Sequence, residues 1–323
     1  MTALDWVLDV IVAVALPVVG WTVTRSPGLP RAVVLFLAFG LLSALAWTRL
    51  AAVDVALVEA SIGTGLLGAL LMTALAWVRA AELSAGRLRA WPGTLPDGMW
   101  GRVVLIAGVA LYLGRVVIDL PRVTEGLAPD VFAHLSEAGV EQPVTAVLLN
   151  LRGYDTMLEI VVLLTAAVSI TMIRTARPEA RRGSDLTIAL ANALLPVSIV
   201  LAGYFLWRGA NGPGGAFQGG AVLAGGAIVA MLAGRMRAPS PTAWWMRALA
   251  VLGPASFLIV AIPRVLAGAS LLEYAPETTG RAIFAIELAS LITIALVLAS
   301  FFPGVGALDA ATDAGQQRGQ GGS

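Results

Sequence analysis

Residues 186–207 read LTIALANALLPVSIVLAGYFLW, an apolar run without a charged side chain. At a rise of 1.5 Å per residue, such a helix crosses the ~30 Å hydrocarbon core of a bilayer. Eight comparable runs occur elsewhere in the 323-residue chain, so the sequence predicts an all-α integral membrane protein with about nine transmembrane helices. The predicted segments are Ala3–Val23, Ala32–Trp47, Val55–Val78, Val103–Leu120, Tyr154–Ile173, Leu186–Trp207, Ala216–Gly234, Ala248–Ala267 and Ala282–Phe302.

The composition agrees with a membrane protein and argues against several functions. Hydrophobic residues make up 58% of the chain and charged residues 13%, whereas soluble domains carry about 25% charge. The net charge of +1 gives no reason to expect a nucleic-acid partner. The chain has no lysine, no cysteine and one histidine, which excludes Schiff-base chemistry, thiolate metal sites and iron–sulfur clusters. We therefore expect no cofactor, no metal site and no enzymatic centre.

Arginine placement predicts the orientation of the helices. Fourteen arginines lie in the connections after odd-numbered segments or in the C-terminal tail, and four lie in the opposite connections. The excess marks the cytoplasmic side, so the N-terminus is predicted outside and the C-terminus in the cytoplasm. The first segment lacks the basic start of a secretory signal and is expected to be retained. Residues 143–151 are too short to span, so we expect them to lie along the interface or to re-enter. Residues 307–323 are expected to be a disordered tail.

Acidic residues recur near the predicted outer ends of the apolar segments. A carboxylate inside a bilayer is costly unless it has a partner, water or an ion, so each is a functional candidate. Asp54 is interpreted as a helix N-cap. Glu59 lies five residues deeper and is interpreted as part of an ion or proton path. The six residues concerned are Asp54, Glu59, Asp119, Asp155, Glu159 and Glu287.

Two arginine–carboxylate pairs are predicted from helical spacing. Arg115 and Asp119 are four residues apart and are interpreted as a structural pair. Arg152, Asp155 and Glu159 share one helical face, where an Arg–Asp pair would leave Glu159 without a partner. Glu159 therefore stays open between a structural role and a role in an ion path.

A glycine-rich segment, residues 208–220, reads RGANGPGGAFQGG between two apolar helices. It cannot be regular helix throughout and is predicted to be a tight re-entrant turn, where backbone approaches backbone or an ion. Chemistry alone favours a close-packed hairpin. The residues concerned are Arg208, Asn211, Gly212, Pro213, Gly214, Gly215, Gly219 and Gly220.

Three stretches together resemble subunits of multisubunit Na⁺/H⁺ antiporters. Residues 208–220 resemble the RGHNxPGGGFxGG signature of the MrpB (MnhB) subunit, with Ala210 in place of histidine and Ala216 in place of glycine. Residues 54–65, DVALVEASIGTG, resemble the DVALTEAxVGxG stretch of the MbhD-like region of MrpA. Residues 151–160, LRGYDTMLEI, resemble the FRGFDTxGEI stretch of the MbhE-like region. The matched charged residues are Asp54, Glu59, Arg152, Asp155 and Glu159.

The resemblance implies a fused subunit with a modular order. An MbhD-like module of three helices would cover 1–100, an MbhE-like module of two helices 101–180, and an MrpB-like module of four helices 181–306, before a tail at 307–323. Its partners would be antiporter-like MrpA and MrpD-type subunits and small MrpC, E, F and G-type subunits in a prokaryotic inner membrane. The absence of lysine agrees with an accessory role.

The same resemblance implies transport of Na⁺ and H⁺. Outer-side capture would use Glu59, Asp155 and Glu159, with Asp54 and Glu287 as further candidates for the path. Two alternatives stay open. The chain could be a membrane-arm subunit of a membrane-bound hydrogenase or a related complex I-like oxidoreductase. It could also be a structural scaffold whose carboxylates form static salt bridges.

Overall fold

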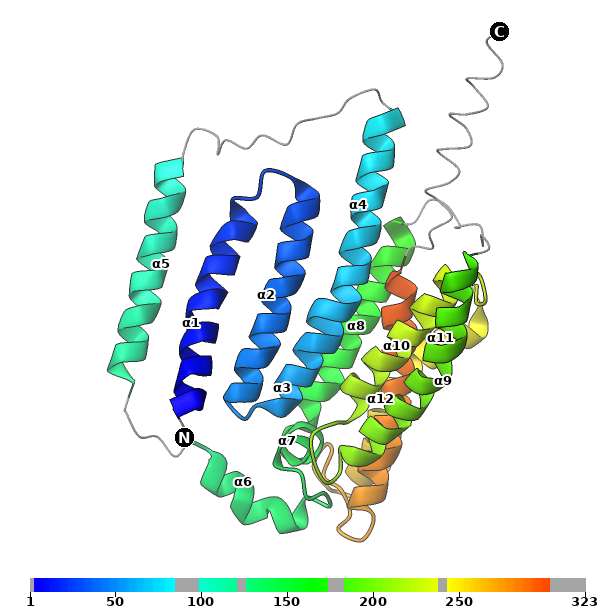
Figure 1. Cartoon of the computed structure of the whole chain (residues 1–323). Helices are drawn as coiled ribbons and strands as arrows, with labels where there is room; N and C mark the ends of the chain where they lie inside the picture. Colours follow the sequence, from blue (N-terminus) through cyan, green and yellow to red (C-terminus); the bar gives the residue numbers. More distant parts are fainter. Residues whose placement is uncertain (1–2, 85–98, 121–125, 174–182, 238–242, 303–323) are drawn as a thin grey trace.

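The computed structural model describes residues 3–84, 99–120, 126–173, 183–237 and 243–302, and their regular structure is entirely helical (Figure 1). Each of the nine predicted segments is helical. The long elements are α1 (Ala3–Thr24), α2 (Leu29–Arg49), the continuous run of α3 (Val53–Val58), η1 (Glu59–Leu66) and α4 (Leu67–Ser84), α5 (Met99–Asp119), α8 (Gly153–Ile173), α9 (Asp185–Arg208), α10 (Ala216–Leu232), α11 (Trp244–Leu266) and α12 (Thr279–Phe301). The short ones are α6 (Ala128–His134), η2 (Leu135–Glu137), α7 (Pro143–Ala146) and η3 (Val147–Leu151).

Six helical stretches of the described chain are long and apolar enough to cross a membrane, in α1, α2, α3 through α4, α9, α11 and α12. Large apolar side chains such as Leu186 and Trp244 are 80% exposed, as expected of surfaces that face lipid. The prediction of an all-helical membrane protein is therefore confirmed. The second segment is longer than predicted, because its helix starts at Leu29 with Pro30 in the first turn, where proline is tolerated.

The best-packed part of the protein is the bundle of α8 to α12. α12 is the most buried spanning helix, and it contacts α8, α9, α10 and α11. α10 packs closely against α9 and α12 because it presents glycines to both. A methyl group on Gly219 would lie 2.9 Å from the Ala202 carbonyl oxygen, and one on Gly220 would lie 2.8 Å from the Ile294 side chain. Close approach through small residues is the usual way that membrane helices associate.

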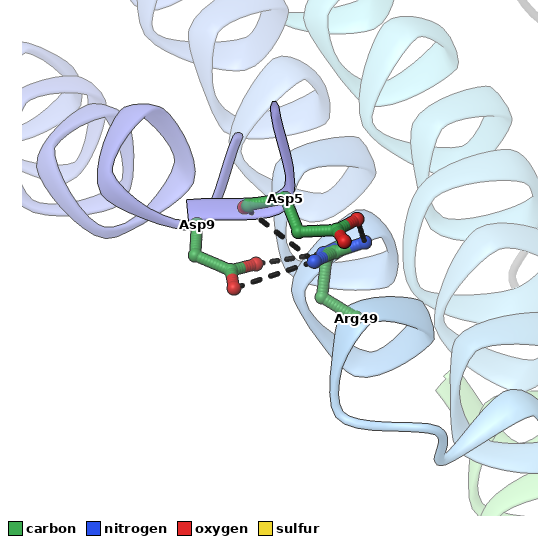
Figure 2. A network of polar contacts seen from close by, with 3 residues as sticks. All are labelled: Asp5, Asp9 and Arg49. Carbon is green, nitrogen blue, oxygen red and sulfur yellow. Dashed lines mark hydrogen bonds and ion pairs between the residues drawn. The ribbon is translucent and has the colours of Figure 1, made fainter. Parts of the chain in front are cut away.

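The N-terminal helices form a second group joined to this bundle through η1 and α3, which both contact α10. α1 packs on α2, and an ionic network joins their ends (Figure 2). Arg49 Nε donates to Asp9 Oδ1 at 2.6 Å, and Nη1 lies 3.3 Å from Asp5 Oδ1. Arg49 is one of the four arginines on the predicted outer side, and these carboxylates supply its counter-charge.

α5 lies at the edge of the molecule (Figure 1), and most of its side chains are exposed. Apart from the backbone of α5 itself, no atom of the described residues lies within 4 Å of the position that a methyl group on Gly108 or Gly114 would take. Arg115 and Asp119 form the ion pair expected from their spacing, at 2.8 Å.

Residues 143–151 form α7 and η3 immediately before α8. Ala146 and Leu149 are buried in one cluster with Phe257 of α11 and Ile286 of α12. This segment therefore packs into the protein interior. The predicted tail, residues 307–323, lies outside the described residues.

Candidate functional site

A cavity of about 340 Å³ lies where α3, η1, α8, α10 and α12 meet the glycine-rich turn. Most of its walls are apolar, with Val55, Val58 and Phe217 among the lining residues. Its polar lining side chains come from segments far apart in the sequence: Asp54, Thr145, Thr156, Glu159, Gln218, Glu287 and Ser290. The cavity therefore brings together three carboxylates, one from each predicted module, in apolar surroundings.

Asp54 connects two distant parts of the chain at this cavity. Its carboxylate accepts hydrogen bonds from the Gly214 backbone N–H and from Gln142 Nε2, each at 2.9 Å. The interpretation of Asp54 as a helix N-cap is wrong, because the N-cap residue of α3 is Ala52 and no side chain caps that end. Both carboxylate oxygens of Asp54 accept hydrogen bonds from residues far away in the sequence, so this side chain does not cap the start of α3.

The glycine-rich turn between α9 and α10 is close-packed, as the sequence indicates. Gly215 has φ of 110°, in the region that favours glycine, and a methyl group on Gly209 would lie 2.7 Å from Gly215 Cα. The turn is also held by the segment before η3. Thr145 Oγ1 donates to the Gly209 carbonyl at 2.6 Å, and Gln142 N–H donates to the Ala210 carbonyl at 3.0 Å. The turn is therefore a junction of three segments.

The remaining residues of the glycine-rich signature support this junction. Asn211 Nδ2 donates to Glu141 Oε2 at 3.0 Å. A methyl group on Gly212 would collide with the Arg208 guanidinium, so Arg208 folds back over its own turn. Pro213 follows directly and precedes Gly214, whose N–H reaches Asp54.

Glu287 lies deep in the bundle and is 4% exposed. Its carboxylate accepts a hydrogen bond from the backbone N–H of Ala216, the first residue of α10. The N-cap residue of α10 is Gly215, which has no side chain to accept a hydrogen bond from the start of the helix. The Glu287 carboxylate, on α12, accepts it instead. The positive end of the α10 dipole thus faces the carboxylate.

The structure separates the five predicted path residues into two groups. Asp54, Glu159 and Glu287 line one cavity, whereas Glu59 and Asp155 do not. Glu59 lies between η1 and α2, where a methyl group on Gly40 would be 3.3 Å from its Oε1. Asp155 forms the expected ion pair with Arg152, and both side chains are exposed. Within the described residues, no group of three His, Cys, Asp or Glu side chains is placed to hold a metal ion.

Sequence reasoning missed the neutral polar residues of the cavity. Ser290 is 2% exposed and its hydroxyl has no hydrogen-bond partner. Gln218 is 6% exposed and lies in the first turn of α10. The spacing of three residues between Glu287 and Ser290 was the one available signal, because such residues share a helical face.

The fold and the site define a multi-helix membrane protein in which acidic residues from distant segments line one cavity. Residues 186–306 match the family described as "Domain related to MnhB subunit of Na+/H+ antiporter", and residues 14–80 match the MbhD family of MBH subunits. The chain therefore combines an MnhB-related domain with an MbhD-type domain, which confirms the resemblance for these two modules. The module boundaries stay predictions.

Two solved structures share this fold. A chain of the "Mrp complex from Dietzia sp. DQ12-45-1b" is 22% identical, with a TM-score of 0.70 over 95% of this chain and 35% of that chain. The protein thus spans about a third of the length of that relative. A chain of an archaeal respiratory complex, the "membrane-bound sulfane sulfur reductase (MBS)", is also 22% identical, with a TM-score of 0.54 over 64% of this chain and 96% of that chain. No curated protein matches the sequence.

Proposed function

We propose that the protein is an accessory ion-path subunit of a multisubunit Mrp-type Na⁺(cation)/H⁺ antiporter in a prokaryotic inner membrane. Its MnhB-related and MbhD-type domains, and the fold it shares with a chain of an Mrp complex, support this class. The observation that carries the proposal is the cavity that Asp54, Glu159 and Glu287 all line. Carboxylate oxygens suit hard cations, and a carboxylate can exchange a cation for a proton.

The proposed path differs in part from the one that the sequence suggested. Glu159 remains part of the proposed path and lines the same cavity as Asp54 and Glu287. The Glu59 side chain lies outside this cavity, between η1 and α2, and Asp155 belongs to the exposed ion pair with Arg152. Because the chain has no lysine, antiporter-like MrpA and MrpD-type partners and small Mrp subunits would complete the path. The chain would have no redox or hydrolytic centre of its own.

The proposal includes a topology: the chain would cross the membrane nine times, with its N-terminus outside and its C-terminus in the cytoplasm. Single cysteines are simple to introduce because the chain has none. A cysteine at Arg181, which lies outside the described residues, or at Arg237 should resist an impermeant external reagent, whereas one at Asn211 should react. Labelling from outside at 181 and 237 but not at 211 would reverse the orientation.

The decisive experiment replaces Glu159 with glutamine in the assembled complex. Glu159→Gln keeps the size of the side chain but removes its charge, so antiport in inverted vesicles should fall at least ~10-fold, which corresponds to ~1.4 kcal/mol or more. Asp155→Asn, one turn earlier on α8, is the matched control and should keep most of the activity. Subunit stoichiometry on native gels should stay normal, because Glu159 is exposed and glutamine breaks no ion pair of the described residues. Normal antiport in Glu159→Gln would contradict the path, and lost assembly would favour the scaffold.

The likeness to the respiratory complex supports a second candidate. The fold covers 96% of that chain, so this protein could serve in the membrane arm of a redox-driven complex. Redox centres would then lie in partner subunits, since this chain has no cysteine. Purification of the native complex distinguishes the two. Copurified subunits with iron–sulfur absorbance would favour the redox-driven complex, and antiporter-like subunits without it would favour the antiporter.

A further inference from the structure

We propose that the Glu287 end of the cavity is a site for water and H⁺. In this site Glu287 takes up and releases the proton, and Ser290 holds the adjoining water. The inference rests on the proposed function and deepens it, because it names H⁺ as the ion that Glu287 exchanges. It also gives a role to Ser290, which the sequence did not single out.

The first observation is the unpartnered hydroxyl of Ser290. Ser290 is 2% exposed, lines the cavity and lies one turn from Glu287 on α12. A buried hydroxyl without a hydrogen bond is costly, and a buried water normally satisfies such groups. The cavity of about 340 Å³ has room for several waters at ~30 Å³ each, and Gln218 supplies a further polar partner.

The second observation is the environment of the Glu287 carboxylate. The N–H of Ala216 donates to it, and the positive end of α10 faces it. The Ala216 N–H and the positive end of α10 stabilise the charged carboxylate, so they oppose a sodium ion and a proton alike and do not select between them. The selection comes from coordination, because a sodium ion needs a shell of oxygen ligands. A proton needs only one carboxylate oxygen and a hydrogen-bonded water, so a single buried carboxylate beside one hydroxyl favours H⁺ over Na⁺.

The charged groups around Glu287 are few and acidic. Of the elements around the cavity, α8 contributes Glu159 and α3 contributes Asp54, whose two oxygens already accept hydrogen bonds. α10 contributes Gln218. The arginines of α9 and α11 are not among the residues that line the cavity. Among the described residues that line the cavity there is therefore no cationic side chain to take the place of the proton.

The chemical step is a proton transfer without change of oxidation state. An O–H bond of a hydronium ion in the cavity breaks as an O–H bond forms on a Glu287 carboxylate oxygen. Water is left beside Ser290, and the carboxylate becomes neutral. Release is the reverse step, toward a water on the other side of the site.

Infrared difference spectroscopy of the purified full chain in lipid tests this site without any transport. Lowering the pH should produce a carboxyl C=O stretching band that shifts in D₂O and is lost in Glu287→Gln. Ser290→Ala should shift the frequency of that band. Ser300→Ala is the matched control on α12, because Ser300 is 5% exposed and its hydroxyl donates to the Val297 carbonyl, so the band should not move. Addition of Na⁺ at fixed pH should leave the band unchanged.

Three results would overturn the inference: a band that persists in Glu287→Gln, a band that Na⁺ abolishes, or a band that Ser290→Ala leaves in place. If Glu287→Gln does not fold, the comparison of Ser290→Ala with Ser300→Ala decides. Antiport by the assembled complex is measured separately. A Glu287-dependent band with normal antiport in Glu287→Gln would refute the ion path and keep the water site. Antiport that is lost in Glu287→Gln, with no Glu287-dependent band in the unchanged chain, would support the ion path and refute the water site.

Discussion

Asp54→Ala should loosen the junction between the N-terminal helices and the glycine-rich turn. The substitution removes both hydrogen bonds of the carboxylate, to Gly214 N–H and to Gln142 Nε2. A hydrogen bond to a charged group contributes ~1.5–3 kcal/mol, and the half-buried position of Asp54 favours the lower figure. Loss of ~1.5 kcal/mol at Gly214 corresponds to a roughly ten-fold higher population of the open turn.

Hydrogen exchange measured by mass spectrometry reports the population of the open turn directly. Amides of residues 209–215 should exchange about ten-fold faster in Asp54→Ala than in the unchanged chain. The control is Asp119→Ala, which breaks an exposed pair with Arg115 and should cost no more than ~0.5 kcal/mol. Unchanged exchange in the turn, or the same increase in both variants, would refute the role of Asp54 as a link between modules.

Other contacts lead to three further predictions. Burial raises the pKa of Tyr274, in the loop before α12, to about 12, against about 10 for a free tyrosine. The unfolded chain loses this proton first, so the free energy of unfolding should fall between about pH 10 and 12, by up to ~3 kcal/mol, and Tyr274→Phe should abolish this part of the pH dependence. Gly219→Ala should destabilise by ~1–3 kcal/mol because its methyl group would meet a backbone carbonyl, whereas Gly225→Ala, with open space around it, should be neutral or stabilising in denaturant titrations. Arg49→Gln should leave Asp9 without its described cation, and faster hydrogen exchange in the first turns of α1 would show it.

The helices could be predicted because a bilayer fixes the length and the polarity of a spanning segment. The run from Leu186 to Trp207 has one physical solution in lipid, so hydropathy was sufficient for α9. The π-helical geometry of η1 could not be predicted. It changes the hydrogen-bond partner of each residue from Glu59 to Leu66 without changing their apolar pattern.

Of the residues that line the cavity, the sequence indicated the three carboxylates as candidates but not the contacts that they make. Asp54 follows a local capping pattern, yet its partner Gly214 lies 160 residues away, and local rules contain no such term. In the sequence, Ser290 resembles any other serine in an apolar helix. That its hydroxyl is buried without a hydrogen-bond partner is seen only once α8 and α10 are packed around it. Residue type therefore identifies candidates inside a membrane, whereas the partners that decide their roles come from packing.

The cavity also has a consequence for biosynthesis. Glu287 and Ser290 lie on the last helix, so the cavity acquires its final wall only when α12 joins the bundle. Before that moment the cavity is open on this side, although Asp54 can already accept hydrogen bonds from Gln142 and Gly214, which precede α12 in the chain. A nascent chain that stops before α12 would leave the Ala216 N–H without the Glu287 carboxylate, a distinctive mark of incomplete synthesis that membrane quality control could detect.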